Sequence, residues 1–442
     1  MKYDIPSWLE KQYRRILIVC TGLIIVVGIV LMQVKMIELD SGQTRSWWEI
    51  IHNVETGRGY KACNEGYVPN CRLTNQYTAI REPLPVYLFA LVGRVTHDSV
   101  IAFQLVQITL VLLILLGVFQ VGREVGGLST GSLAVLIWTI YVPAMRLEVK
   151  ITGDLLEGMF MVFGTLKFLH VLKRGESKDW IMFGILFGLA VLSRSAALIF
   201  VSALGFGYLV YVYMKRRNLI PVMDGWHKKA TSSIIAFALV LSPWALRNWL
   251  VFGKPVIGTT LTGYVIYRHN AIVASDAPPH FVGPAEAIEL IKKLSVRRPE
   301  LLTPLNEVQV NHLFMEESLS LIKAHPGNYI KLSLYRFIPL WFDVGIAEQY
   351  GEQIFIWRWP MIFEQIILLI IFILGLRIDD LRLRLIGFGI FIYILAYLGV
   401  QGQLRYLVPI SPEIIVIGSM GFLNGMSLRK HMVGKRQIAS DS

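Results

Sequence analysis

The chain has 442 residues, of which 54% are hydrophobic and 17% are charged, and its mean hydropathy is +0.54. These values exclude a water-soluble globular protein, because so few charges cannot cover a solvated surface. The net charge of +12 would also suit a nucleic-acid-binding protein. However, the basic residues stand in short clusters beside apolar stretches, which is the positive-inside pattern of a membrane protein. The composition therefore predicts an all-α polytopic membrane protein with no nucleic-acid partner.

Ten apolar stretches are long enough, or nearly so, to cross about 30 Å of hydrocarbon as helices. They cover residues 16–36, 99–121, 129–147, 151–171, 180–195, 197–214, 231–249, 356–376, 386–400 and 405–425. Because the basic clusters belong on the cytoplasmic side, both chain ends are cytoplasmic and the number of crossings is even. An eleventh stretch, 329–344, carries Lys331 and Arg336, so we expect it to lie at the outer interface with Trp341 at headgroup depth.

This topology divides the chain into five parts. They are a cytoplasmic N-terminus (1–15), an N-terminal transmembrane module (16–249) with a first outer catalytic loop (37–98), an outer region (250–355), the C-terminal transmembrane helices (356–426) and a cytoplasmic tail (427–442). Within the outer region, apolar residues at helical spacing in 285–294 and 307–324 predict two amphipathic helices that rest against the membrane. The charged outer segments predict that the function lies on that face.

Two of the three cysteines, Cys63 and Cys71, lie eight residues apart in the first outer loop. The charge rule places this loop in an oxidising compartment, where disulfides form and persist. Metal binding by the pair is less well supported, because no second Cys/His pair stands nearby at zinc spacing. We therefore expect a disulfide between these two residues.

The candidate chemistry lies among charged residues at the outer ends of the apolar stretches. Asp40 follows the first stretch and Asp154 stands in the fourth, whereas Arg194, Arg247 and Arg405 stand at the outer ends of later ones. Ionisable groups at such depth are costly unless they face a wet cavity or a partner. Two carboxylates in one cavity would suit a general base or a divalent cation, and arginines would suit an anionic substrate group. The structural alternatives are a carboxylate solvated at a helix end and an arginine that binds lipid phosphates.

Several longer segments carry a resemblance to a known family. Residues 56–60 form a glycine-rich turn, 78–87 contain Arg-Glu-Pro-Leu, 187–194 read Phe-Gly-Leu-Ala-Val-Leu-Ser-Arg, and 243–253 read Pro-Trp-Ala-Leu-Arg-Asn-Trp-Leu-Val-Phe-Gly. Tyr264 and Asn270 follow, and Arg405-Tyr406 precedes Pro409 and Pro412. In this order the segments resemble the GT-C glycosyltransferases that use polyprenyl-phosphate sugars. The likeness is greatest to the bacterial family 39 members related to protein O-mannosyltransferases and lipid A aminoarabinose transferases.

The resemblance implies a GT-C-type bundle of about 10–11 transmembrane helices and an inverting sugar transfer. The donor is a sugar on a polyprenyl phosphate such as undecaprenyl phosphate, and the acceptor is an extracytoplasmic lipid, glycan or protein. In this family an acidic residue of the first outer loop is the catalytic base, which Asp40 matches best, and Asp154 matches a second acidic residue. The resemblance also implies a bacterial inner membrane, with the active site facing the periplasm.

A departing phosphate needs positive charge around it. The candidates for this role are Arg194, Arg247 and Arg405, with Arg81 and Lys150 behind them; Arg247 alternatively holds the outer loop in place. The resemblance points to Tyr406, Tyr264 and Asn270 as further substrate-binding residues, and Trp47 is a candidate for stacking on the sugar.

Some alternatives stay open at this level. The family often shows an acidic residue directly after the base or a tyrosine four residues later, where this chain has Ser41 and Thr44, so Glu38 or Glu49 are alternative bases. No cofactor is certain, and a divalent cation between Asp40 and Asp154 is an open alternative. A transporter or flippase of a lipid-linked substrate, or a noncatalytic membrane assembly subunit, would also place charges at helix ends.

Overall fold

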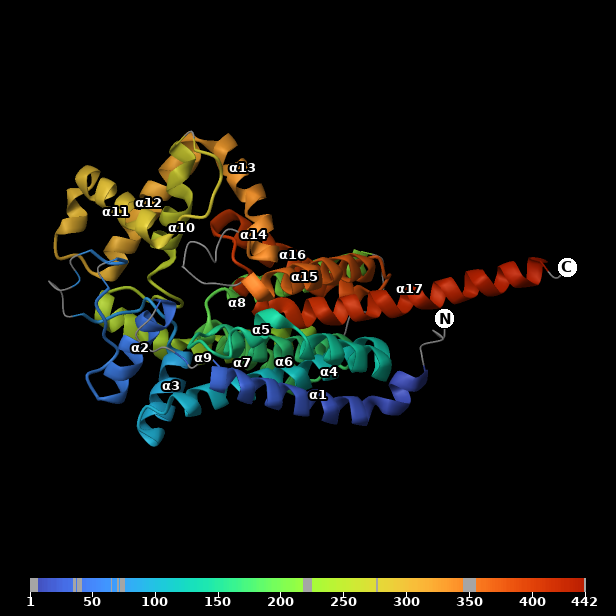
Figure 1. Ribbon diagram of the computed structural model, residues 1–442. Helices are drawn as coiled ribbons and strands as arrows, with labels where there is room; N and C mark the ends of the chain where they lie inside the picture. The colour runs from blue at the N-terminus through green and yellow to red at the C-terminus, as the bar shows by residue number, and fades with distance from the viewer. Residues whose placement is uncertain are drawn as a thin grey trace.

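The computed structural model describes residues 7–34, 37, 42–64, 66–69, 71, 76–217, 225–275, 277–344 and 355–440. These residues form a long bundle of helices with a lobe of shorter helices at one end (Figure 1). Helix α1 (Ser7–Val34) begins, and α17 (Ser411–Ser440) ends, at the end of the bundle away from the lobe. This placement agrees with an outer lobe and with chain ends on the opposite membrane face.

In the described part of the chain, nine long helices build the bundle. Between α1 and α17 come α4 (Val100–Thr139), α6 (Asp154–Lys173), α7 (Ser177–Ser193), α8 (Ala197–Arg217), α9 (Trp226–Phe252), α15 (Phe355–Leu376) and α16 (Leu381–Val400). Among the described residues, eight helices are long and apolar enough to cross a membrane, and α7, with 17 residues, is two residues shorter than the shortest of them. The expectation of an all-α polytopic membrane protein is therefore confirmed.

Helix α4 is a hairpin rather than one rod, because Gly126 and Gly127 have non-helical backbone angles. Gly127 has a φ of 81°, which glycine adopts without steric cost. The two arms then lie against each other: a Cβ on Gly122 would meet the backbone of Gly131, and the Trp138 indole N–H donates to the Val111 carbonyl at 3.3 Å. Two predicted spans, 99–121 and 129–147, correspond to these arms. The second arm ends at Thr139, and a four-residue helix, α5 (Val142–Met145), follows with Pro143 in its first turn.

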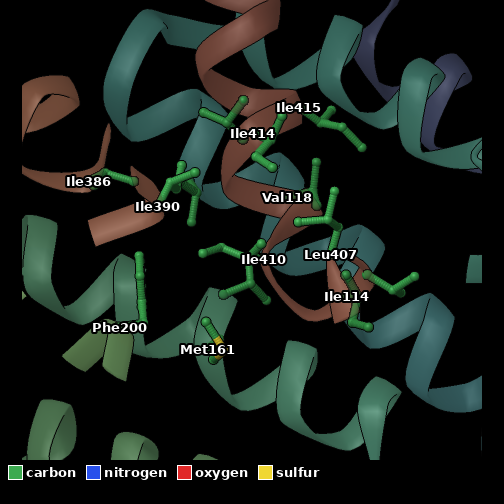
Figure 2. Close-up of a cluster of buried hydrophobic side chains, with 14 of the residues drawn as sticks. Ile114, Val118, Met161, Phe200, Ile386, Ile390, Leu407, Ile410, Ile414 and Ile415 are labelled. Carbon is green, nitrogen blue, oxygen red and sulfur yellow. The ribbon is translucent and has the colours of Figure 1, made fainter. Parts of the chain in front are cut away.

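Close backbone contact holds the bundle together. A Cβ on Gly421 of α17 would collide with Gly375 of α15, and a Cβ on Gly184 of α7 would collide with Ser233 of α9. Small residues at such crossings permit the van der Waals contact that associates helices in lipid. Figure 2 shows the centre of the bundle, where apolar side chains of α4, α6, α8, α16, α17 and the segment before α17 meet: Ile114, Val118, Met161, Phe200, Ile386, Ile390, Leu407, Ile410, Ile414 and Ile415.

The lobe has its own apolar core. It contains α2 (Gly42–Glu55), α3 (Pro83–Thr96), α10 (Thr262–Asn270), α11 (Pro284–Arg297) and α12 (Glu307–Ala324), and α13 (Pro326–Tyr335) and α14 (Phe337–Phe342) lead back to the bundle (Figure 1). Helices α11 and α12 confirm the two helices predicted at 285–294 and 307–324; their rest against the membrane stays a prediction. The Cys63–Cys71 disulfide is also confirmed.

Residues 329–344 differ from the expectation of one interfacial helix. They form the end of α13 and all of α14, and the Trp341 side chain is only 1% exposed, so it packs inside the protein; its depth in the membrane stays a prediction. Arg336 between the two helices is buried as well. Its guanidinium donates to the His269 carbonyl, to Asn270 Oδ1 at 2.9 Å and to the carbonyls of Leu398 and Gly399 at 3.1 Å. Burial lowers the pKa of Arg336 to about 10, so it stays charged at neutral pH and ties α10 to the end of α16.

Candidate functional site

The centre of the candidate site is a contact between Asp154 and Arg194, which are 40 residues apart. Asp154 is the first residue of α6 and is fully buried, with its charge at a helix N-terminus, where an anion is favoured. Arg194 follows the last residue of α7 in an extended conformation. Its Nη1 donates to Asp154 Oδ1 at 2.5 Å, and its side chain is 17% exposed. The two sequence-predicted residues thus form a largely buried ion pair.

A second arginine joins this pair through Tyr406. Tyr406 is 2% exposed and ends the short helix η5 (Leu404–Tyr406). The Arg194 guanidinium lies 4.7 Å and the Arg405 guanidinium 4.6 Å from the centre of the Tyr406 ring, and Arg405 Nη2 donates to the Tyr406 hydroxyl. The two guanidinium groups are thus no more than about 9 Å apart. Tyr397 of α16 stacks on Tyr406 with ring centres 4.8 Å apart.

Two carboxylates that the sequence reasoning did not assign complete this cluster. Glu157 stands three residues after Asp154, hence on the same face of α6, and its Oε2 is 4.0 Å from Arg194 Nε. It is fully buried, and no hydrogen-bond donor among the described residues reaches either of its oxygens or Asp154 Oδ2. Glu82, just before α3, accepts from the backbone N–H and the hydroxyl of Ser195, each at 2.9 Å. The sequence feature that could have identified Glu157 is a second carboxylate one turn into an apolar helix.

We call Glu82, Asp154, Glu157, Arg194, Arg405 and Tyr406 the bundle-end cluster. Three carboxylates and two guanidinium groups meet there, where the bundle joins the lobe. The unpaired buried oxygens make this arrangement costly for stability alone. Such a cost is typical of a binding or catalytic site.

Arg247 lies in different surroundings. Its guanidinium donates to the carbonyls of Thr78 at 2.8 Å and Tyr60 at 3.1 Å, and to Asn248 Oδ1 at 2.7 Å. Tyr60 in turn donates from its hydroxyl to the carbonyls of Arg81 and Glu82. These bonds favour the alternative in which Arg247 holds the first outer loop in place.

The predicted residues of the first outer loop lie in the lobe. Arg81 Nη2 donates to the Ser46 hydroxyl at 2.6 Å, and the guanidinium lies 5.2 Å from the buried Trp47 ring. Glu49 Oε1 accepts from the Cys63 N–H at 3.0 Å, so this carboxylate holds the disulfide loop. Lys150 lies before α6, and its carbonyl accepts from the Gln107 amide. Arg81, Trp47 and Glu49 therefore belong to the lobe.

Tyr264 and Asn270 belong to α10 in the lobe. Tyr264 is buried against the rings of Tyr67 and Phe314 inside the lobe. Asn270 is fully buried, and its oxygen accepts from Arg336. Asp40 and the alternative base Glu38 lie outside the described residues.

Comparison with known proteins agrees with this fold. The sequence model of the dolichyl-phosphate-mannose-protein mannosyltransferase family matches residues 81–245, which include Glu82, Asp154, Glu157 and Arg194. The apo oligosaccharyltransferase of Archaeoglobus fulgidus superposes with a TM-score of 0.57 over 94% of this chain, at 15% identity. Residues 81–245 are thus similar to this mannosyltransferase family, and the fold of the chain is similar to that of the archaeal oligosaccharyltransferase. The chain spans about half of the archaeal protein, 51% of its length.

Two further solved structures are similar to this chain. The A. fulgidus oligosaccharyltransferase AglB in complex with an inhibitory peptide and a dolichol-phosphate has a TM-score of 0.51 at 14% identity, over 94% of this chain and 50% of that one. ArnT from Cupriavidus metallidurans bound to undecaprenyl phosphate has a TM-score of 0.42 at 10% identity, over 89% of this chain and 77% of that one. No curated protein matches the sequence.

Proposed function

We propose that the protein transfers a sugar from a polyprenyl phosphate to an acceptor outside the cytoplasm. The observation that supports this most directly is the pair of arginines around Tyr406 at the lobe end of the bundle, beside the buried Asp154. Guanidinium groups bind phosphate oxygens through paired hydrogen bonds, and a partly buried site strengthens such contacts. The cluster therefore suits a phosphate that arrives and departs at the membrane surface.

The carrier is proposed to be a polyprenyl phosphate because Asp154 and Arg405 stand at the ends of helical segments that are long and apolar enough to cross a membrane. Its apolar tail would lie along the lipid-facing bundle while the phosphate meets Arg194 and Arg405. The dolichol-phosphate in the AglB complex supports this carrier class, at the level of a shared fold. The wider setting we propose is a bacterial inner membrane, with the lobe in the periplasm and a lipid, glycan or protein as acceptor.

In the proposed reaction an acceptor hydroxyl attacks the anomeric carbon while the bond from that carbon to the phosphate oxygen breaks. The hydroxyl proton passes to the Asp40 carboxylate, and the polyprenyl phosphate leaves with its charge held by the arginines. Attack opposite the leaving phosphate inverts the anomeric centre. Asp154 keeps the Arg194 fork in position for this departure.

A divalent cation is a second candidate for neutralising the phosphate. Asp154 offers the buried Oδ2, while its Oδ1 is already held by Arg194. In the described residues Asp154 has no cluster of three metal-ligating side chains around it, and its proposed partner Asp40 lies outside them. We therefore assign the charge-neutralising role to the arginines.

Native mass spectrometry of the gently purified protein tests the donor site. Arg194→Ala and Arg405→Ala should lose a co-purifying polyprenyl phosphate, whereas Arg384→Ala should retain it. Arg384 is the matched control because it pairs with Asp379 at 2.9 Å in an exposed position at the start of α16. Arg194→Lys and Arg405→Lys keep the positive charge. They are controls that show whether the alanine variants lose the carrier because they misfold. A carrier that stays bound in both alanine variants contradicts the site, and carrier movement across vesicles without sugar transfer would indicate a flippase.

A further inference from the structure

A second set of chemically active side chains lies at the far end of α3. His52 and Glu55 stand three residues apart on α2, and Asp98 follows α3. One ligand atom from each residue lies within 4.8 Å of the other two. The 14 residues of α3 separate this set from Glu82 by about 20 Å, at 1.5 Å per residue. These three residues therefore belong to neither the bundle-end cluster nor the proposed sugar transfer.

The electrostatics of this set call for a cation. Among the described residues, Glu55 Oε2 and Asp98 Oδ1 are buried oxygens that no donor reaches with hydrogen-bond geometry. The two oxygens lie close to Gly93, where an added Cβ would be 2.8 Å from Asp98 Oδ1 and 3.4 Å from Glu55 Oε2. Glu55 is also the last residue of α2, and Asp98 lies just past the end of α3. Helix C-termini carry partial negative charge, so the ends of α2 and α3 further disfavour the two negative carboxylates.

His52 adds an imidazole nitrogen ligand to the two carboxylates. Its Nδ1 is buried, has no hydrogen-bond partner and lies 3.6 Å from Glu55 Oε2. Ligand atoms around a tetrahedral zinc with bonds of about 2.0–2.2 Å are about 3.3–3.6 Å apart, so this separation fits two ligands of one ion. The Trp48 ring lies 5.8 Å from the imidazole and restricts its position. An imidazole with two carboxylates is a donor set suited to zinc rather than to calcium or magnesium, which prefer oxygen alone.

We propose that His52, Glu55 and Asp98 bind a zinc ion that fastens α2 to α3. Three protein ligands and a water would complete a tetrahedral site. Because α2 follows the segment that carries Asp40, and α3 follows Arg81 and Glu82, the ion would fix two parts of the first outer loop relative to each other. Its role would be structural.

Zinc binding to the full-length protein in detergent tests this proposal. The wild type, stripped with a chelator and titrated with ZnCl₂, should bind one ion per chain. It should also unfold at a higher temperature with zinc than without. Glu55→Gln and Asp98→Asn should each weaken zinc binding at least ~10-fold, because each removes a charged ligand.

Glu286→Gln is the matched control. His280 Nε2 and Glu286 form a similar contact at 3.0 Å, but they lack a third ligand in the described residues. This variant should bind zinc as the wild type does. Equal zinc affinity in Glu55→Gln and wild type would overturn the proposal. A second result would also overturn it: no zinc binding, together with a Glu55→Gln variant that is more stable than the wild type at neutral pH. That result would identify Glu55 and Asp98 as a carboxyl pair that shares a proton.

Discussion

Arg194 and Arg247 both stand at helix ends beside the lobe, yet their surroundings differ. Arg247 donates to two carbonyls and an amide oxygen, so its hydrogen bonds hold a loop. Arg194 pairs with one oxygen of Asp154 and packs on Tyr406, while buried carboxylate oxygens beside it have no donor. An arginine that donates to several acceptors is typical of a structural role. Buried charges that lack hydrogen-bond partners are typical of a binding or catalytic site. The contrast predicts that the two regions respond differently to substitution.

The largest effect is expected at Asp154. Asp154→Asn should lower the rate of sugar transfer at least ~100-fold, because the Arg194 guanidinium loses its charged partner and its fixed position. The measurement is transfer from a radiolabelled polyprenyl-phosphate sugar in reconstituted vesicles. Asp379→Asn, at the exposed Arg384 pair, is the control and should leave transfer unchanged. Unaltered transfer in Asp154→Asn would remove this residue from the site.

Arg247→Ala should act on stability instead. Loss of its three hydrogen bonds should cost about 2–3 kcal/mol of unfolding free energy, because two loop carbonyls lose their charged donor. Thermal unfolding in detergent measures this loss, and native mass spectrometry of the folded fraction should still show bound polyprenyl phosphate. If Arg247→Ala loses the carrier as Arg194→Ala does, the contrast between framework and site is wrong.

Removal of the disulfide, which lies in the lobe, should lower the free energy of unfolding by a similar amount. Cys63→Ser should destabilise the protein by about 2.5 kcal/mol through the freedom that a short loop gains in the unfolded chain. Thermal unfolding under non-reducing conditions measures the change. The wild type with added reductant should match the variant, and a variant with unchanged stability would show that the loop is held by Glu49 and its neighbours.

The smallest effect concerns pH. Burial, helped by nearby Arg268, Arg336 and Arg405, lowers the pKa of His269 well below its usual 6.5. The unfolded chain therefore takes up a proton before the folded one does, so stability is lost as pH falls below about 6.5. His269→Gln should show a weaker decline of unfolding temperature between pH 7 and pH 5. An identical decline would show that other groups control this range.

The fold and the centre of the site were predictable for a physical reason. Hydrophobic length and basic clusters determine crossings and sides, so Asp154, Arg194 and Arg405 were expected on one face, and three distant helix ends do meet there. Their partners were not predictable. Arg247 bonds to carbonyls of a loop whose path no spacing reveals, and Glu157 was overlooked inside an apolar run.

Tyr264 and Asn270 show the limit of a motif. Their pattern follows the Arg247 segment in the sequence, but the structure uses both within the lobe, with Asn270 held by Arg336. The early end of the helix predicted at 129–147 has a local cause, because α5 begins anew at residues 142–143 with a proline in its first turn.

The reversal at Gly126 and Gly127 determines the sidedness of everything after it. Without it, the 40 residues of α4 would continue away from the lobe and deliver Asp154 to the opposite membrane face. Two residues that carry no chemistry thus decide at which end of the bundle Asp154 stands, since every later helix inherits its direction from that turn.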